Sequence, residues 1–394
     1  MNPLFSAIYC PKIIVGRGSL SYFSTLGKKR IGVIGYTDEL NSTVKTLANE
    51  TGAEVCYLAQ VTQEPLIGDI FLCVERTRDF QPDMILAIGG GSVLDTAKAV
   101  HLFYENPDLR LEDALIPFSL PALGKKAIHV SVPTTSGTGS ETTSVAVLID
   151  PVTKIKRLLM DNTLIPHYAI LDADLTDSLP DHIALSTGMD ALTHAIEASV
   201  AKNASAYSRA LALGAASDIL ENLELSVSSC CDAEKKKNVK EKMHVAASLA
   251  GIAITNSCTG LAHSYDHPGP AFGIPHGTVC GLMLPYTMKF CGPQDAYATL
   301  AHRLGYVGEC TELSQQLIDH IFSMMNRIGF KTCFRDMGVD ERAYLSKIDE
   351  WAETSLSAFA TVVSPAQMTA ERGRKLFEDC YYGNHPQFSD EASM

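Results

Sequence analysis

Two segments of the chain carry typical metal-binding residues at the spacing of one helical turn. Asp190 and His194 stand four positions apart, which on a helix places a carboxylate and an imidazole on the same face. His263 and His267 repeat this spacing, and His276 follows in a stretch punctuated by glycine and proline. A lone histidine is more often structural, but one carboxylate with several imidazoles suits Fe²⁺, Zn²⁺ or a similar ion. The sequence therefore predicts one divalent metal site.

A metal ion that takes part in catalysis needs an open coordination position, so we do not expect all five residues to be ligands. His263 and His267 lie one helical turn apart, and the residues alone leave open which of them binds the ion. Asp190 and His194 could instead be a surface pair, or a capping carboxylate with a core histidine. Because no cysteine belongs to the set, we expect a catalytic site rather than a structural zinc site.

Two glycine-rich turns follow predicted strands in the first half of the chain. Residues 89–98 read Gly-Gly-Gly-Ser-Val-Leu-Asp-Thr-Ala-Lys, and residues 134–140 read Thr-Thr-Ser-Gly-Thr-Gly-Ser. Glycine lets the backbone approach a phosphate, and the following helix offers free N–H groups and a positive dipole end. Either turn alone could be an ordinary tight turn, and the first departs from the GxGxxG spacing. Together, at the ends of strands, they favour a dinucleotide site.

The elements expected around these turns are short strands that alternate with amphipathic helices. Such alternation favours a largely parallel sheet with helices on both faces. The expected strands are 31–34, 54–58, 84–88 and 127–132, and the expected helices are 43–51, 69–78 and a segment that begins at Ser92.

From residue 183 onward the pattern changes to long amphipathic segments, and the alternation typical of strands is nearly absent. We place the boundary between the two patterns near Pro180. The predicted organisation is an α/β dinucleotide-binding domain over residues 1–180 and an all-α metal-binding, catalytic domain over residues 181–394. Helices are expected over 183–201, 205–223, 233–254, 313–328 and 366–381.

Composition argues against several other classes of protein. The formal net charge of −13 disfavours nucleic acid or an anionic membrane as the main partner. No apolar run reaches the roughly 18 residues that a membrane span needs, and residues 1–9 lack the features of a signal peptide. The 11 cysteines are scattered and form no CxxC pair, so we expect reduced thiols in a cytoplasmic protein.

These motifs resemble those of the iron-containing, group III alcohol dehydrogenases, and the resemblance covers nearly the whole chain. It implies an N-terminal Rossmann-like domain and a C-terminal helical domain, the architecture of dehydroquinate synthase. It also implies a metal-containing, NAD-linked alcohol dehydrogenase or aldehyde reductase, and we expect a homo-oligomer, dimer or larger. The resemblance is carried by residues 89–98, by Pro-Thr-Thr-Ser-Gly-Thr-Gly-Ser-Glu at 133–141, by Leu-Asp-Ala-Asp-Leu-Thr at 171–176, by Thr-Gly-Met-Asp-Ala-Leu-Thr-His-Ala-Ile-Glu-Ala at 187–198, and by Gly-Leu-Ala-His at 260–263 with Ile-Pro-His-Gly at 274–277.

The resemblance also assigns roles to individual residues. His267 would lie beside the substrate, where it could relay a proton or orient the substrate oxygen. The ion would act as a Lewis acid while hydride passes between substrate and nicotinamide. The implied metal ligands are Asp190, His194, His263 and His276. The pyrophosphate of the cofactor would lie on Gly89, Gly90, Gly91 and Ser92, with further cofactor contacts from Asp95, Thr134, Thr135, Thr138 and Lys156.

One acidic residue bears on the choice between NAD and NADP. Asp38 lies in the turn where the adenosine ribose should bind, and residues 35–40 contain no Lys or Arg. An acidic side chain there repels a 2′-phosphate, which favours NAD over NADP. Tyr36 is the other candidate for the discriminating position.

Two departures from the family pattern fall near the substrate. The segment from His267 to His276 is one residue shorter than usual, and Ser264-Tyr265-Asp266 replaces a more apolar stretch. The substrate therefore stays open. Small aldehydes and alcohols are the default, and short acid-bearing aldehydes such as sulfoacetaldehyde or phosphonoacetaldehyde are a further possibility.

Three other functions remain as alternatives: a lyase of the dehydroquinate synthase type, a polyol oxidation like that of glycerol dehydrogenase, and a non-catalytic metal-binding scaffold. A lyase for a phosphorylated, sugar-like substrate should carry Lys and Arg near the metal. The basic residues between the ligand segments instead fall mostly within 235–242. A dehydrogenase assay with short alcohols separates these alternatives.

Overall fold

The computed structural model describes residues 7–62, 64–151, 156–228 and 232–388, without the side chains of residues 38–41. The chain divides into two compact units. We call Tyr9–Leu179 the α/β unit, and Pro180–Met394 together with Met1–Ile8 the helical unit. The division between them falls at Pro180.

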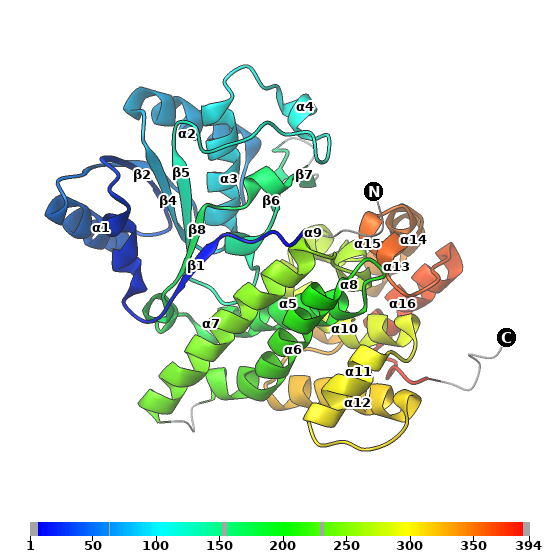
Figure 1. Ribbon diagram of the computed structural model, residues 1–394. Coiled ribbons are helices and arrows are strands. Elements are labelled where there is room, and N and C mark those ends of the chain that lie inside the picture. Colours follow the sequence, from blue (N-terminus) through cyan, green and yellow to red (C-terminus); the bar gives the residue numbers. More distant parts are fainter. Residues whose placement is uncertain (1–6, 63, 152–155, 229–231, 389–394) are drawn as a thin grey trace. The chain divides into compact units, whose positions relative to one another are not determined.

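The α/β unit is built on a six-stranded sheet in the order β1-β8-β5-β4-β2-β3, in which all neighbouring strands are parallel (Figure 1). A separate antiparallel hairpin pairs β6 with β7. The predicted α/β class with a parallel sheet is therefore confirmed. The strands are β1 Lys12–Val15, β2 Arg30–Gly35, β3 Glu54–Gln60, β4 Met84–Gly89, β5 Ile128–Pro133, β6 Val145–Ile149, β7 Lys156–Met160 and β8 Tyr168–Leu171.

The central strand β4 is buried along its whole length, because helices cover both faces of the sheet. Successive side chains of a strand point to opposite faces. Ile85 and Ala87 pack with residues of α2 and α3, whereas Met84, Leu86 and Ile88 pack with residues of α1 and η1. The helices of this unit are η1 Ser19–Leu26, α1 Asp38–Glu50, α2 Ile67–Phe80, α3 Gly91–Glu105, α4 Leu111–Ala114, η2 Ser140–Thr142, η3 Asn162–Leu164 and η4 Ala173–Thr176.

The strand order reverses direction between β2 and β4. The chain passes from β2 outward to β3 and then returns to the other side of β2 as β4. In the ladders Gly35 lies beside Ile88, and Gly89 lies beside Pro133. The segments that follow β2, β4 and β5 therefore leave the sheet at one edge. Such a switch point is where open α/β sheets bind their ligands.

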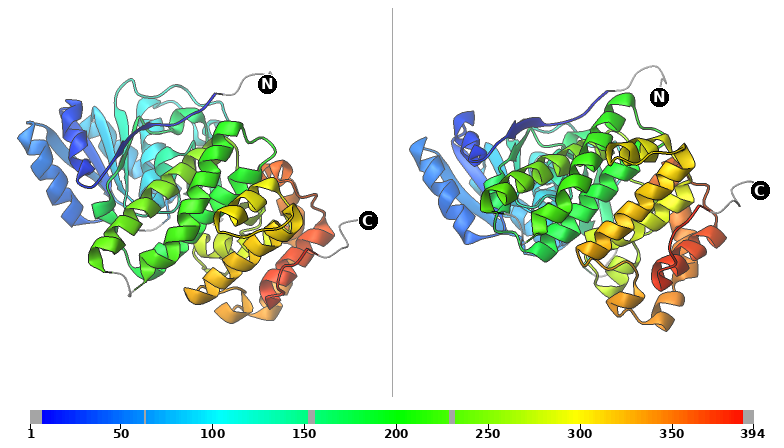
Figure 2. Two further views of the ribbon diagram at one scale, coloured as in Figure 1. Left: turned by 60° about the horizontal axis from the view of Figure 1, so that its bottom comes forward. Right: turned by 90° about the horizontal axis from the view of Figure 1, so that it is seen from below.

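The described part of the helical unit contains helices and no strand, as predicted. Its three longest helices, α5, α6 and α7, pack side by side (Figure 2). No described helix is both long and apolar enough to cross a membrane. The helices are α5 Asp181–Val200, α6 Ala206–Val227, α7 Ala233–Thr255, α8 Leu261–Ser264, α9 Pro268–Phe272, α10 His276–Cys291, α11 Asp295–Arg303, α12 Cys310–Arg327, η5 Arg335–Met337, α13 Glu341–Leu345, α14 Ile348–Leu356, α15 Phe359–Val363 and α16 Ala370–Tyr382.

Candidate functional site

Helix α5 carries three polar side chains along one face. Asp190, His194 and Glu197 follow one another at the spacing of successive helical turns. All three are buried, with exposed fractions of 2%, 5% and 6%. A buried carboxylate is costly unless hydrogen bonds or opposite charges compensate for the loss of water. The surroundings of α5 must therefore supply that compensation.

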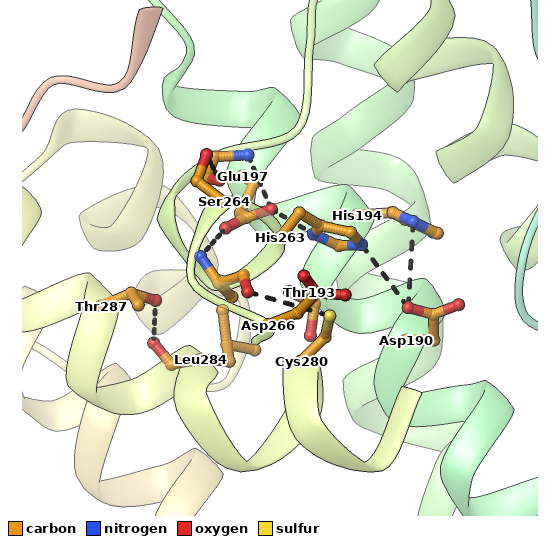
Figure 3. A network of polar contacts seen from close by, with 12 residues as sticks. Asp190, Thr193, His194, Glu197, His263, Ser264, Asp266, Cys280, Leu284 and Thr287 are labelled. Carbon is orange, nitrogen blue, oxygen red and sulfur yellow. Dashed lines mark hydrogen bonds and ion pairs between the residues drawn. The ribbon is translucent and has the colours of Figure 1, made fainter. Parts of the chain in front are cut away.

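Three imidazoles converge on one oxygen of Asp190, and Figure 3 shows two of them, those of His194 and His263. The Oδ1 atom lies 3.6 Å from His263 Nε2, 3.8 Å from His276 Nε2 and 3.9 Å from His194 Nε2. These distances are too long for hydrogen bonds. Within the described residues neither Asp190 Oδ1 nor His263 Nε2 has a hydrogen-bond partner, although both atoms are buried. The carboxylate oxygen and the imidazole nitrogens therefore lie close together without forming hydrogen bonds to one another.

The charges of this group favour a bound cation. Burial raises the pKa of the Asp190 carboxyl, but the imidazoles, His194 foremost, lower it below its usual range. Burial also lowers the pKa of His194, against the opposing charge of Asp190. In His263 and His276 burial acts the same way, but nearby groups, Cys280 foremost, raise the pKa of both rings. The lowered pKa favours the charged carboxylate of Asp190, which is the form that binds a divalent ion.

Glu197 positions His263. Its Oε2 accepts a hydrogen bond from His263 Nδ1 at 2.6 Å and another from Gly260 N at 2.7 Å, while Oε1 accepts from Ala262 N at 2.6 Å. A carboxylate has only acceptors, so Nδ1 of His263 is the donor. In the neutral ring Nε2 then presents its lone pair toward Asp190. The same carboxylate also binds backbone N–H groups at the start of the short helix α8.

Asp266 positions His276 through a hydrogen bond to Nδ1, as Glu197 positions His263. Its Oδ2 accepts a hydrogen bond from His276 Nδ1 at 2.9 Å. His276 is the first residue of α10, and Gly277 lets this helix end approach α5 closely. A Cβ on Gly277 would lie 2.4 Å from the carbonyl oxygen of Ser186 and 2.9 Å from Asp190 Cβ. Glycine is therefore required here to bring His276 beside Asp190.

The two glycine-rich turns of the α/β unit pack against each other. Thr134 N donates to the carbonyl oxygen of Gly89 at 3.0 Å. A Cβ on Gly91 would lie 2.8 Å from the Thr138 side chain, and one on Gly90 would lie 3.4 Å from Thr135. The turn after β4 and the turn after β5 thus form one surface at the N-terminus of α3, and the N-terminus of a helix is a favourable place for an anion.

Two other predicted cofactor residues lie beside these turns. Asp95 accepts hydrogen bonds from Ser140 Oγ at 2.6 Å and Val147 N at 2.9 Å, and burial raises its pKa. Both carboxylate oxygens therefore hold the second turn and β6 against α3. Lys156 begins β7, paired with the end of β6. For both residues a contact with the cofactor stays a prediction.

The predicted ribose site follows β2, next to the strand that carries the first turn. Tyr36 is 52% exposed, and its carbonyl oxygen accepts a hydrogen bond from Gln60. Asp38 begins α1, but its side chain lies outside the described residues. The discrimination between NAD and NADP therefore stays a prediction.

Comparison with known proteins places the whole chain in one family. The family model described as iron-containing alcohol dehydrogenase matches residues 10–173, and the model for the C-terminal part of this family matches residues 184–381. The chain belongs to the iron-containing alcohol dehydrogenase family. The resemblance found in the sequence is confirmed, and the protein is an NAD(P)-dependent alcohol dehydrogenase of the metal-dependent type.

Individual relatives align with most of this chain. The NADPH-dependent butanol dehydrogenase of Clostridium saccharobutylicum is 35% identical over 95% of this chain and 98% of its own length. The solved iron-containing alcohol dehydrogenase of Thermococcus thioreducens is 31% identical, with a TM-score of 0.87 over 96% of this chain and 100% of that one. The sulfoacetaldehyde reductase of Bifidobacterium kashiwanohense, solved with NAD⁺, is 25% identical, with a TM-score of 0.81 over 95% and 98%. The chain spans only 42% of the longer aldehyde-alcohol dehydrogenase of Streptococcus pneumoniae serotype 2, at 33% identity over 89% of this chain.

The alcohol dehydrogenases of this family need a divalent metal ion, and the donors around Asp190 fit one. Four ligands placed about 2.1 Å from an ion at the corners of a tetrahedron lie about 3.4 Å apart. The separations of 3.6–3.9 Å around Asp190 Oδ1 need little adjustment to reach that value. The buried Oδ1 and Nε2 atoms that lack partners elsewhere in the described structure would find one in the ion.

His267 lies apart from these converging atoms. Its Nε2 lies 2.9 Å from Ser355 Oγ, and its ring stacks on Trp351 with a centroid distance of 6.1 Å. His263, not His267, faces Asp190. This placement supports the assignment of His263 to the metal, while the part of His267 in catalysis stays a prediction.

Sequence reasoning missed three residues of the site. Glu197 stands three positions after His194, on the same helical face, and Cys280 stands four after His276. Asp266 was noted only as a departure from the family pattern. Ligand atoms of Asp190, His263, His276 and Cys280 all lie within 4.8 Å of one another, so a cysteine that the sequence analysis did not include lies beside the predicted metal ligands.

We expect Glu197→Gln to weaken metal binding about 10- to 100-fold, because partners that orient a metal-binding histidine typically contribute this much. Glutamine keeps the size of the side chain but loses the charge and one acceptor. The measurement is a competition titration of the metal-free protein with a chelator. The matched control is Glu224→Gln, because Glu224 lies exposed on α6 and forms an ion pair with Arg327. Equal affinity in the two variants would contradict the role of Glu197.

Proposed function

We propose that the protein interconverts a small alcohol and its aldehyde at a divalent ion held by Asp190, His194, His263 and His276. The observation that carries this proposal is the convergence of three imidazole nitrogens on the buried Asp190 Oδ1, at distances of 3.6–3.9 Å. One carboxylate and three imidazoles leave a divalent ion with a net positive charge. They also leave room in its coordination shell for a substrate oxygen.

When bound, the ion supplies Lewis acidity at the substrate oxygen and the nicotinamide carries the hydride. The protein's own residues orient these groups. Glu197 and Asp266 fix the His263 and His276 rings through their Nδ1 atoms. His267 is the proposed catalytic residue beside the substrate. Its hydrogen bond with Ser355 Oγ gives it a partner for moving or holding a proton.

The cofactor half of the proposal rests on the α/β unit. Gly89, Gly90, Gly91 and Ser92 would receive the pyrophosphate at the N-terminus of α3. Thr134, Thr135 and Thr138 line the neighbouring turn, and Asp95 holds that turn in place. Lys156 and Asp38 complete the proposed set, the latter at the ribose.

For the substrate we favour a short aliphatic alcohol. Trp351 stacks on the ring of His267 and meets Phe272 edge-on at 6.3 Å, so aromatic side chains lie beside His267. An apolar wall suits an alkyl chain better than a sulfonate or phosphonate, which needs cationic partners. The name of the butanol dehydrogenase agrees with this choice, and that of the sulfoacetaldehyde reductase keeps the acid-bearing aldehydes as the second candidate.

The test is a dehydrogenase assay on the protein loaded with Fe²⁺ or Zn²⁺, followed at the NADH absorbance. The panel contains ethanal, butanal, sulfoacetaldehyde, phosphonoacetaldehyde, glycerol and propane-1,3-diol. We expect the highest kcat/KM with butanal. A preference for an acid-bearing aldehyde or for glycerol would replace our substrate assignment, and turnover that is independent of metal would contradict the proposed site.

We further expect at least a tenfold higher kcat/KM with NADH than with NADPH. The acidic Asp38 and the absence of Lys and Arg over residues 35–40 would leave a 2′-phosphate uncompensated. The butanol dehydrogenase is named for NADPH and the sulfoacetaldehyde reductase was solved with NAD⁺, so the relatives do not decide the question. Asp38→Ala should bring the two efficiencies closer together, whereas Glu39→Ala should not. A clear preference of the unaltered protein for NADPH would show that this turn was misread.

The homo-oligomeric state and the cytoplasmic location stay predictions. The lyase and scaffold alternatives lose their support, because both halves of the chain match an alcohol dehydrogenase family.

A further inference from the structure

A thiol lies among the metal-binding residues of the helical unit. Cys280 is fully buried on α10, one turn after His276. Its Sγ lies 3.7 Å from both ring nitrogens of His276. Together with donor atoms of Asp190 and His263, these two residues form a group in which every pair of ligand atoms lies within 4.8 Å. His194 is not part of this tighter group of four.

Two observations besides the cysteine itself indicate that an ion belongs beside it. Asp190 is 2% exposed and its Oδ1, directed at the group, has no hydrogen-bond partner among the residues that the structure describes. The buried Nε2 of His263 likewise has no hydrogen-bond partner among the described residues. Three helices, α5, α8 and α10, thus direct oxygen, nitrogen and sulfur donors at one point.

The other contacts of Cys280 are weak. The carbonyl oxygen of Ala262 lies 3.9 Å from Sγ, at the long limit for a sulfur hydrogen bond. A thiol is a weak donor in any case. Alanine or valine could fill this buried position as well as cysteine does, but neither carries an atom that could bind a metal.

We propose that Cys280 is a further ligand of the divalent ion in this protein, and that its sulfur gives the site a preference for thiophilic ions such as Zn²⁺ or Co²⁺ over Fe²⁺. The proposal rests on the metal site of the proposed function and adds one donor to it, so that five protein donors leave a sixth position for the substrate oxygen. On binding, the thiol proton passes to solvent and a sulfur lone pair forms the bond to the ion. No electron is transferred, so no oxidant or reductant is needed.

The expected preference follows from ligand chemistry. Thiolate is a soft donor that selects Zn²⁺, so a sulfur ligand increases the preference for Zn²⁺ over Fe²⁺ beyond that of carboxylate and imidazole donors alone. The proposed site therefore holds a soft ion more tightly than one built from Asp190 and imidazoles only.

The test uses the full-length, metal-free protein and Co²⁺ alone as the probe. A cobalt–thiolate bond gives an intense charge-transfer absorption in the near ultraviolet, which oxygen and nitrogen ligands do not give. We expect this band in the unaltered protein at one Co²⁺ per chain. We also expect it in Cys333→Ser, a control in the same unit whose cysteine is equally buried but lies outside the group.

In Cys280→Ser the band should disappear while the protein still binds one Co²⁺. The ratio of Zn²⁺ to Fe²⁺ affinity should fall about tenfold or more, as is typical when a group at a metal site is altered. Cys280→Ala should show the same loss of the band and the same change in affinity ratio, and it replaces Cys280→Ser if the serine variant does not fold.

The possible results separate the two proposals. A cobalt-loaded, unaltered protein without the band overturns the role of Cys280 and leaves the metal site standing. A band that persists in Cys280→Ser assigns the sulfur to another residue and also overturns it. Failure of the unaltered protein to bind Co²⁺ removes the metal site and the inference together.

Discussion

Asp190→Ala is expected to lose the divalent ion and to reduce kcat/KM with the best alcohol about a thousandfold or more. The carboxylate lies within 3.9 Å of three imidazole nitrogens and is the negative charge at the centre of the group. A metal ion contributes several kcal/mol to charge stabilisation, and each 1.4 kcal/mol corresponds to a factor of ten in rate. The measurement is metal content per chain, followed by the dehydrogenase assay.

A second buried aspartate of the helical unit provides the control. Asp379 on α16 is also 2% exposed, and it pairs with Lys375 and Asn384 rather than with imidazoles. Asp379→Ala therefore tests the general cost of removing a buried carboxylate. We expect this variant to be less stable but to keep its ion. Full metal occupancy in Asp190→Ala would remove Asp190 from the ligand set.

His263→Ala and His267→Ala are expected to fail in different ways, although the two residues lie one turn apart in the sequence. His263 faces Asp190 at 3.6 Å and is held by Glu197, so its loss should remove the ion. His267 faces Ser355, so its loss should leave the ion bound and slow turnover about 10²- to 10⁴-fold, the range for a missing acid–base group.

Metal content and a pH–rate profile, measured for both variants under matched conditions, separate these roles. His267→Ala should change the shape of the profile, because a group that moves a proton is then absent. Ser355→Ala should change it in the same direction but less. A metal-free His267→Ala together with a metal-bound His263→Ala would show that the two roles are exchanged.

The grouping of Asp190 with His194 could be predicted because regular helices give spacing a direct meaning. Asp190 and His194 share a face of α5 whatever the rest of the fold does. Cys280 escaped prediction because α10 itself was not expected. Its sequence contains Gly277, Gly281 and Pro285, which usually interrupt helices. Tertiary packing overrides that tendency here, since all three residues are buried against the rest of the unit.

The order of the sheet could not be predicted for a different reason. β1 and β8 have four residues each, and their pairing joins Lys12 to Tyr168. No local pattern encodes a contact between segments so distant in the chain. The β6–β7 hairpin was missed because Val145–Ile149 is apolar throughout and shows no alternation.

The role of Asp95 could not be predicted from its motif alone. Its position in the glycine-rich segment implied a contact with the cofactor. In the structure both oxygens accept hydrogen bonds from Ser140 and Val147. A motif identifies the residue, but only packing shows whether the side chain serves the ligand or the protein around it.

The hydrogen bonds of Glu197 also constrain when the protein can acquire its ion. Glu197 and the His263 that it orients lie 66 positions apart, and His276 and Cys280 are synthesised later still. During synthesis α5 therefore emerges from the ribosome well before the other proposed ligands of the ion. At the proposed site, capture of the ion therefore has to wait until α8 and α10 have been synthesised and have packed against α5. The supply of metal then matters most to chains that have already been completed.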